Sequence, residues 1–145
     1  MTTTANKALI QRFYEEVWGR GNLEVADEVF AADYVRHDLR PTNALPGPEG
    51  QKKIAADFRG AFPDLHVTVD LVLTEGDLVA ARWTMEGTHT GAWGKVPATG
   101  KRAGFSGVNI FRIENGKVAE IWNHRDDLGL MEQLGVPIYA GSQRS

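Results

Sequence analysis

The alternation of apolar and polar residues in the second half of the chain constrains its fold more than any other feature. Apolar side chains occupy every second position over 65–73 and 79–85, and a third run over 105–113 follows the same period. A period of two is typical of strands that bury one face. Asn115-Gly116 then gives a strong signal for a two-residue type I′ hairpin, which leads into a last strand over 117–125. The sequence therefore predicts an antiparallel meander.

Helical patterns fill the first part of the chain. Apolar residues spaced as on one helix face predict a helix over 6–19, and a third helix follows over 54–62. Asn22 is the expected N-cap of a short second helix between them. A short strand is expected over 34–37. The segment 39–50 is rich in Pro, Gly and Asn and is long enough to act as a lid.

Helices followed by a meander predict an α+β fold in which a curved antiparallel sheet wraps over three helices. The curvature leaves a cavity at the wide end, and a short helix over 126–134 closes the domain. A chain of 145 residues is expected to form a single domain, with its core at about 6–135 and a tail after Pro137. The outer face of the sheet is expected to meet a second copy in a homodimer or higher homo-oligomer, through Arg82, Thr84, Glu86 and Val108.

Composition excludes several classes of function. The formal net charge is −3, and basic residues form no long cluster, so a nucleic-acid partner is not expected. The absence of cysteine excludes disulfides, thiolate metal sites and a cysteine nucleophile. No apolar run approaches the ~20 residues that span a bilayer, and no signal peptide is evident. The expected location is the cytoplasm, without membrane attachment.

The alternation also predicts which side chains face the cavity. The inner positions of the central strands are Trp83, Met85, Phe105, Asn109 and Phe111, and those of the last strand are Ala119, Ile121, Asn123 and Arg125. An apolar cavity with a few convergent polar groups is how small-molecule sites are built. The two asparagines are therefore candidate functional residues, although they could instead satisfy buried backbone groups. Candidate contacts to a bound molecule are Tyr14, His37, Phe58, Trp83, Phe105 and Ile121.

The remaining titratable residues give weaker signals. His37 ends the first strand, just before the expected lid. His124 should point away from the cavity unless a β-bulge reverses it. Asp126 is first interpreted as the cap of the last helix. The histidines have no metal-ligand spacing, and the chain has no phosphate-loop or dinucleotide motif, so neither a metal nor a cofactor is expected.

Four segments, GTHTG, PATGK, FRIENGKVAEIW and DLGLMEQLG, carry a resemblance to a known family. With their surroundings, from about Leu9 to Gly135, they resemble the SnoaL-like polyketide cyclases and ester cyclases. The resemblance implies the cone-shaped fold of nuclear transport factor 2, a variant of the ferredoxin-like arrangement, and an oligomer. It also implies a role in making aromatic polyketides such as anthracyclines. Such cyclases close a ring by intramolecular aldol condensation without a cofactor.

The resemblance breaks at two positions. In the family, the residue after the strand tryptophan, here Trp122, is usually the catalytic aspartate, and the facing strand usually carries a second titratable residue. Here these positions are Asn123 and Asn109. An amide cannot take up a proton near neutral pH. The sequence therefore favours hydroxylation of an anthracycline-type intermediate over cyclisation.

In the hydroxylase hypothesis, an electron-rich polyketide reacts with oxygen, with or without a separate reductase. Asn109, Asn123 and Arg125 would stabilise the developing negative charge. The alternative is an aldol cyclase in which Asp126 or His37 has become the base. A non-catalytic module that binds a small molecule is the third hypothesis. The candidate catalytic residues are thus Asn109, Asn123, Arg125 and Asp126.

Overall fold

The computed structural model describes residues 2–39 and 44–137, so part of the expected lid and the tail after Pro137 lie outside the described residues. The elements, in chain order, are α1 (Thr3–Arg12), the π-helix η1 (Phe13–Gly19), the 3-10 turn η2 (Leu23–Val25), α2 (Ala26–Val29), β1 (Phe30–His37), α3 (Pro48–Ala61), β2 (His66–Glu75), β3 (Leu78–Thr88), β4 (Arg102–Glu114), β5 (Lys117–Arg125) and α4 (Asp127–Leu134).

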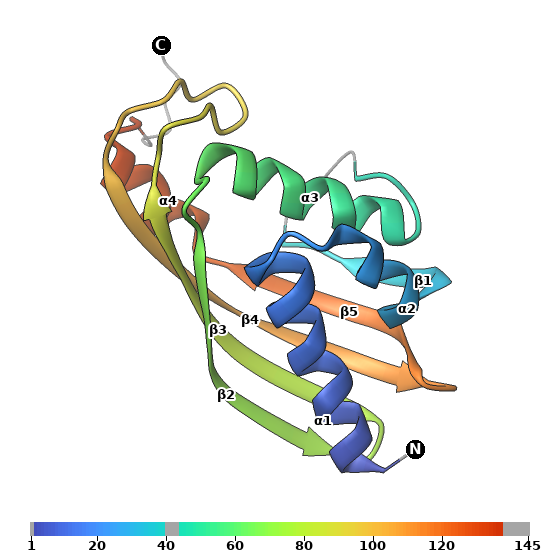
Figure 1. Ribbon diagram of the computed structural model, residues 1–145. Coiled ribbons are helices and arrows are strands. Elements are labelled where there is room, and N and C mark those ends of the chain that lie inside the picture. Colours follow the sequence, from blue (N-terminus) through green and yellow to red (C-terminus); the bar gives the residue numbers. More distant parts are fainter. Residues whose placement is uncertain (1, 40–43, 138–145) are drawn as a thin grey trace.

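The sheet has five strands in the order β1-β5-β4-β3-β2. The strands β2 to β5 form the antiparallel meander that the alternation predicts. Figure 1 shows α1, α2 and α3 together on one side of this open, curved sheet, which confirms the α+β fold. The strand β1 departs from the predicted antiparallel sheet, because it pairs with β5 in parallel. A long connection through α3 separates β1 from the meander, so no local turn fixes its direction.

The first helix changes its geometry halfway. The Thr2 hydroxyl caps α1 by accepting a hydrogen bond from the amide of Ala5 at 3.0 Å. From Phe13 the helix widens into η1, which buries Phe13, Tyr14, Val17 and Trp18. Such π-helical segments are rare and often lie at functional sites. The predicted helix over 6–19 is therefore present as two segments, and the second one faces the cavity.

The predicted second helix is shorter than expected. A 3-10 turn and a single α-helical turn replace it, and the Asn22 side chain makes no cap. The Asn22 amide instead donates to Glu16 at 3.4 Å. Asn22 thus occupies the predicted N-cap position, but its side chain contacts the preceding π-helix and does not cap the backbone.

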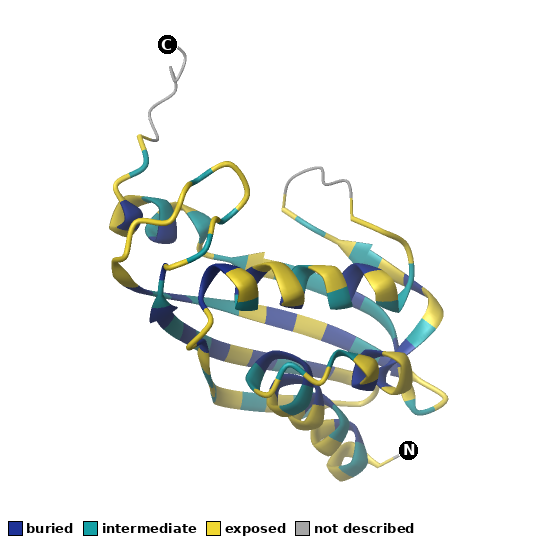
Figure 2. Cartoon of the chain, turned by 45° about the horizontal axis from the view of Figure 1, so that its top comes forward, coloured by how far each residue is buried: buried dark blue, intermediate teal, exposed yellow. Residues whose placement is uncertain are grey.

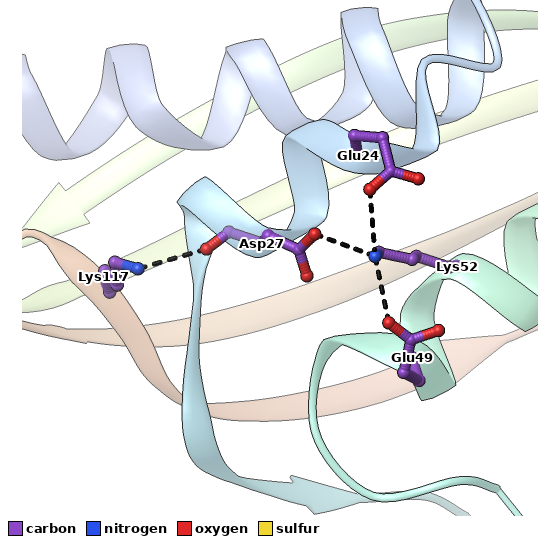
Figure 3. Close-up of polar contacts among 5 residues, drawn as sticks. All are labelled: Glu24, Asp27, Glu49, Lys52 and Lys117. Atoms are coloured by element: carbon purple, nitrogen blue, oxygen red, sulfur yellow. Dashed lines mark hydrogen bonds and ion pairs between the residues drawn. The ribbon is translucent and has the colours of Figure 1, made fainter.

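A group of charges, which we call the Lys52 cluster, links this region to α3 and to β5 (Figure 3). The Lys52 ammonium lies 2.8 Å from Asp27, 3.0 Å from Glu49 and 3.3 Å from Glu24. Hydrogen bonds to Asp27 and Glu49 raise the pKa of Lys52 well above its usual value. Lys117 adds a bond to the backbone carbonyl of Asp27 at 3.1 Å. These ionic contacts hold the short α2 turn in place.

Buried and exposed residues alternate along the strands, as the bands in Figure 2 show. One register shift alters the pattern in β5. Arg112 pairs with Glu120, but the next residue, Ile113, pairs with Val118. Ala119 is the extra residue of this bulge, and Val118 is the buried side chain. The inward assignment of Ala119 was therefore wrong, because strict alternation cannot foresee a bulge.

The outer face of the sheet carries exposed apolar side chains from three neighbouring strands: Leu71, Leu73, Leu78, Val108 and Ile110. Arg82 lies on the same face and pairs with Asp70. This is the face on which the sequence predicts contact with a second copy, and that contact stays a prediction. Within residues 2–39 and 44–137, no helix is long and apolar enough to cross a membrane.

Candidate functional site

A cavity of about 260 Å³ lies between the helices and the inner face of the sheet. Its wall is mixed, with aromatic and aliphatic groups beside several polar ones. The lining residues are Phe13, Tyr14, Trp18, Arg36, Asp38, Leu39, Gln51, Ile54, Trp83, Met85, Asn109, Ile121, Asn123, Arg125 and Asp127. The volume is near the lower end of the range for small-molecule pockets.

A chain of hydrogen bonds, which we call the amide chain, crosses the cavity wall. The Tyr14 hydroxyl and the Trp83 indole N–H both donate to Oδ1 of Asn109, at 2.5 and 2.6 Å. The Asn109 amide nitrogen donates to Oδ1 of Asn123 at 2.6 Å. The Asn123 nitrogen donates in turn to Oδ1 of Asp38 at 3.0 Å. The chain thus joins η1, β3, β4 and β5 to the residue that follows β1.

The direction of the amide chain follows from its two ends. The indole N–H of Trp83 can only donate, so the atom that it contacts is the carbonyl oxygen of Asn109. A carboxylate such as that of Asp38 can only accept, so the nitrogen of Asn123 must face it. Each amide nitrogen has two hydrogens, and the chain uses one of them. The second hydrogen of each asparagine can donate to a molecule in the cavity.

Burial fixes the protonation state at the phenol end of the amide chain. Tyr14 is 1% exposed, and this burial raises the pKa of its hydroxyl well above 10.0. The phenol therefore stays neutral at physiological pH and keeps its hydrogen for Asn109. An oxygen that accepts two short hydrogen bonds polarises its amide, which strengthens the donor hydrogens on the nitrogen.

Two arginine–aspartate pairs lie in the cavity wall. Arg36 donates through Nε to Oδ2 of Asp38 at 2.9 Å, and 15% and 19% of the two side chains are exposed. Arg125 donates two hydrogen bonds to Asp127, at 2.6 and 3.2 Å, one to each carboxylate oxygen. The guanidinium of Arg125 also lies 4.7 Å from the ring centre of Phe58. The cavity thus holds two carboxylates, each beside a cation.

Six residues that the sequence predicts for the site line the cavity together: Tyr14, Trp83, Asn109, Ile121, Asn123 and Arg125. Phe58 and Phe105 do not belong to the lining. They are buried behind it, with ring centres 5.3 Å apart. Phe58 still contributes indirectly, because it packs against the guanidinium of Arg125.

The structure places His37 and Asp126 outside the cavity. The His37 side chain is 44% exposed, pairs with Glu120 at 2.7 Å and stacks on Trp122. Alternation in β1 turns Arg36 inward and His37 outward. Asp126 caps α4 by accepting a hydrogen bond from the amide of Gly129 at 2.9 Å, as its first interpretation predicts. The assignments of His37 to substrate contact and of Asp126 to catalysis therefore find no support in the geometry.

Sequence reasoning missed Arg36, Asp38 and Asp127. The sequence does carry a signal for Arg36 and Asp38. Both lie at even spacing from Tyr34, so a period of two places them on the same face of the strand as that residue. Tyr34 is apolar enough to mark this face as the inner one. Nothing local marks Asp127, which lines the cavity beside its partner Arg125. Exposed His124 points away from the cavity, as alternation predicts.

Among the described residues, no group of three or more His, Asp or Glu side chains is placed to hold a metal ion. The donors in the cavity are amides, a phenol, an indole and two guanidinium groups, and the acceptors include two carboxylates paired with those guanidinium groups. This set is suited to hydrogen bonding with a carbonyl oxygen and to proton transfer with a carbon acid.

Comparison with known proteins gives consistent matches over nearly the whole chain. The family profile described as SnoaL-like polyketide cyclase matches residues 8–134. The chain is 28% identical over 131 residues to aklanonic acid methyl ester cyclase DnrD of Streptomyces peucetius, which covers 89% of this chain and 90% of that protein.

Solved structures also resemble the chain in fold and sequence. TsrD from Streptomyces laurentii has a TM-score of 0.84 at 28% identity, with 94% of this chain and 99% of that chain covered. AclR from Streptomyces galilaeus, which is provisionally assigned as a hydroxylase, has a TM-score of 0.82 at 28% identity, with 94% and 100% covered.

Proposed function

Because this chain belongs to the SnoaL-like polyketide cyclase family, we propose that it is a cofactor-independent tailoring enzyme that closes a ring in an aromatic polyketide by intramolecular aldol addition. The observation that carries this proposal is the amide chain, which presents oriented N–H donors beside a carboxylate in one cavity. Aldol closure needs both functions, since a base must remove a proton and donors must stabilise the enolate oxygen.

The expectation of hydroxylation rested on the missing acid at Asn109 and Asn123. The cavity supplies carboxylates at Asp38 and Asp127 instead, so the missing acid no longer counts against cyclisation. The relatives also give the hydroxylase no preference, since the curated relative DnrD is named as a cyclase.

The reaction balances without an added reactant. A base removes a hydrogen on the carbon next to a carbonyl, and the C–H electron pair becomes an enolate. The enolate carbon attacks a second carbonyl in the same molecule and forms the new C–C bond, while the π electrons move to that oxygen. The resulting alkoxide takes the proton back from the protonated base, so the product is an isomer of the substrate.

The rest of the cavity wall is suited to a largely apolar substrate. Phe13, Trp18, Ile54, Trp83 and Met85 give it aromatic and aliphatic walls. These apolar side chains contribute binding affinity but do not orient the substrate. The asparagine amides fix the position of the substrate carbonyl.

Hydroxylation is the second candidate, and amides at both Asn109 and Asn123 together with the similarity to AclR favour it. Unlike ring closure, hydroxylation needs O₂ and a reductant. Insertion of one atom of O₂ into a C–H bond forms water from the other atom, and this consumes two electrons and two protons from a reductant. A reduced substrate or a separate reductase must supply them.

Product analysis separates these candidates. We would incubate the purified protein with aklanonic acid methyl ester, the compound named in its curated relative, in air and under nitrogen, and analyse the products by mass spectrometry and NMR. We expect an isomer with a new ring under both atmospheres. A product that gains one oxygen atom only in air, and only with a reductant, would replace the cyclase with the hydroxylase. Tight binding without any product would identify a binding module.

A further inference from the structure

Asp38 is placed in the cavity by the geometry of β1. The strand ends at His37, and the inward parity of Tyr34 and Arg36 continues to Asp38. The carboxylate lines the same cavity as Asn109 and Asn123, with 19% of its side chain exposed. It is therefore accessible to a bound molecule and largely shielded from bulk water.

Donors from two different strands hold the Asp38 carboxylate, and each of its oxygens accepts from one of them. Asn123 from β5 donates to Oδ1 at 3.0 Å, and Arg36 from β1 donates to Oδ2 at 2.9 Å. A carboxylate held at both oxygens has a fixed plane, which is what proton transfer at a defined carbon requires. The first donor belongs to the amide chain, so Asp38 and the candidate oxyanion donors keep a constant spacing.

The other titratable groups near the site are less suited to remove a proton. Both oxygens of Asp127 accept hydrogen bonds from one charged group, the guanidinium of Arg125, whereas one oxygen of Asp38 accepts from the neutral amide of Asn123. Asp126 and His37 lie outside the cavity. Tyr14 is a neutral donor to Asn109, and burial raises its pKa. Among the residues that the structure describes around the cavity, Asp38 is the carboxylate that accepts a hydrogen bond from the amide chain, through Asn123.

Building on the proposed function, we propose that Asp38 is the general base of this site, that Asn123 and Arg36 position it, and that Asn109 and Asn123 donate to the enolate oxygen. Asp38 breaks the C–H bond by taking the proton, and the electron pair is delocalised onto the carbonyl oxygen. The protonated Asp38 then returns the proton to the alkoxide that ring closure forms. The substrate class is a carbonyl compound with an acidic hydrogen between two activating groups.

The direct test is the isosteric variant Asp38→Asn, which keeps the size and hydrogen-bonding shape of the side chain but cannot take a proton. We expect kcat to fall roughly 10²–10⁴-fold, with KM nearly unchanged. Asp38→Glu, which restores the carboxylate one methylene further out, should recover part of the rate.

Asp70→Asn is the matched control. Asp70 also accepts one bond from an arginine and one from a neutral donor, Arg82 at 2.5 Å and Thr84 at 2.7 Å, but on the outer face of the sheet. The same change of charge there should leave kcat and its pH profile as in the wild type. Thermal unfolding and substrate binding of each variant show that the protein is folded and that the cavity is intact.

Hydrogen–deuterium exchange at the acidic carbon of the substrate, followed by NMR in D₂O, tests the base separately from ring closure. Exchange by the wild type but not by Asp38→Asn supports Asp38 as the base, whether or not a ring forms. If exchange occurs without ring closure, the base stands and the proposed cyclase is overturned. If Asp38→Asn exchanges and closes the ring at the wild-type rate, Asp38 is not the base, while the cyclase stands. If the folded, substrate-binding wild type catalyses no exchange, the inference is wrong.

Discussion

The Lys52 cluster and the amide chain both connect helical segments to the sheet, but they are built from different groups. The Lys52 cluster gathers three exposed carboxylates around one ammonium, as Figure 3 shows for the contacts. The amide chain is mostly neutral, buried and directional, since each amide accepts at one end and donates at the other. Ionic contacts to several partners tolerate loss of one, whereas a directional chain loses its order at the first broken bond.

The two networks therefore contribute differently. Exposed ion pairs add little stability each, because water and salt screen them. Buried neutral hydrogen bonds also add little on balance, but loss of one partner leaves a desolvated group without compensation. Substitutions in the amide chain should thus affect both stability and activity, and substitutions in the Lys52 cluster should affect only stability.

The largest effect is expected from Asn109→Leu. This change removes the acceptor of both Tyr14 and Trp83 and leaves two buried donors unpaired. We expect the free energy of unfolding to fall by about 2–5 kcal/mol, measured by urea denaturation, with loss of activity. Asn109→Asp keeps an acceptor for both donors and should lose less stability. A loss below about 1 kcal/mol in the leucine variant would show that the chain is not structurally coupled.

Tyr14→Phe should have a smaller effect, because Trp83 still donates to Asn109. We expect a loss of about 1 kcal/mol in the free energy of unfolding and a rate lowered about fivefold. Steady-state kinetics should show the change in kcat rather than in KM, since the phenol acts through Asn109. An unchanged kcat would mean that polarisation of the amide does not contribute to the reaction.

His89 extends the comparison to a buried polar group that can acquire a charge. Its side chain accepts a hydrogen bond from the amide of Thr99 at 3.2 Å, and burial lowers its pKa below 6.5. The unfolded chain therefore binds a proton before the folded chain does as the pH falls through 6.5. Stability should decrease from that pH towards the lower pKa of the folded state.

The variant His89→Gln isolates this contribution. Between about pH 7 and pH 5, the wild type should lose more stability than the variant, as measured by the midpoint of thermal unfolding. Equal slopes in the two proteins would show that His89 does not titrate differently on unfolding.

The smallest effect on stability is expected from Lys52→Gln in the Lys52 cluster. The three carboxylates that pair with Lys52 are exposed to solvent. The midpoint of thermal unfolding should therefore fall by no more than about 3 °C. The difference should shrink at high salt, and kcat should not change. A change in kcat would show that the α2 turn is coupled to the cavity.

Much of the fold could be predicted because a period of two is a local property. It identified β2 to β5, and it placed Trp83, Asn109 and Asn123 on one face before any contact was known. The same logic failed at Ala119, and also at Leu71 and Leu73, because irregularities in β5 and β2 shift the register. It also gave no warning that the helix over 6–19 changes to π geometry at Phe13.

The sequence by itself thus determined the meander, most of its inward side chains and the family, because alternation and motif spacing are local properties of the chain. Only the tertiary structure decided that β1 lies parallel to β5 and that Asp38 meets Asn123 there. The physical reason is distance along the chain, since 85 residues separate Asp38 from Asn123. No local propensity acts over that separation, and packing of the whole core brings the carboxylate and the amides together.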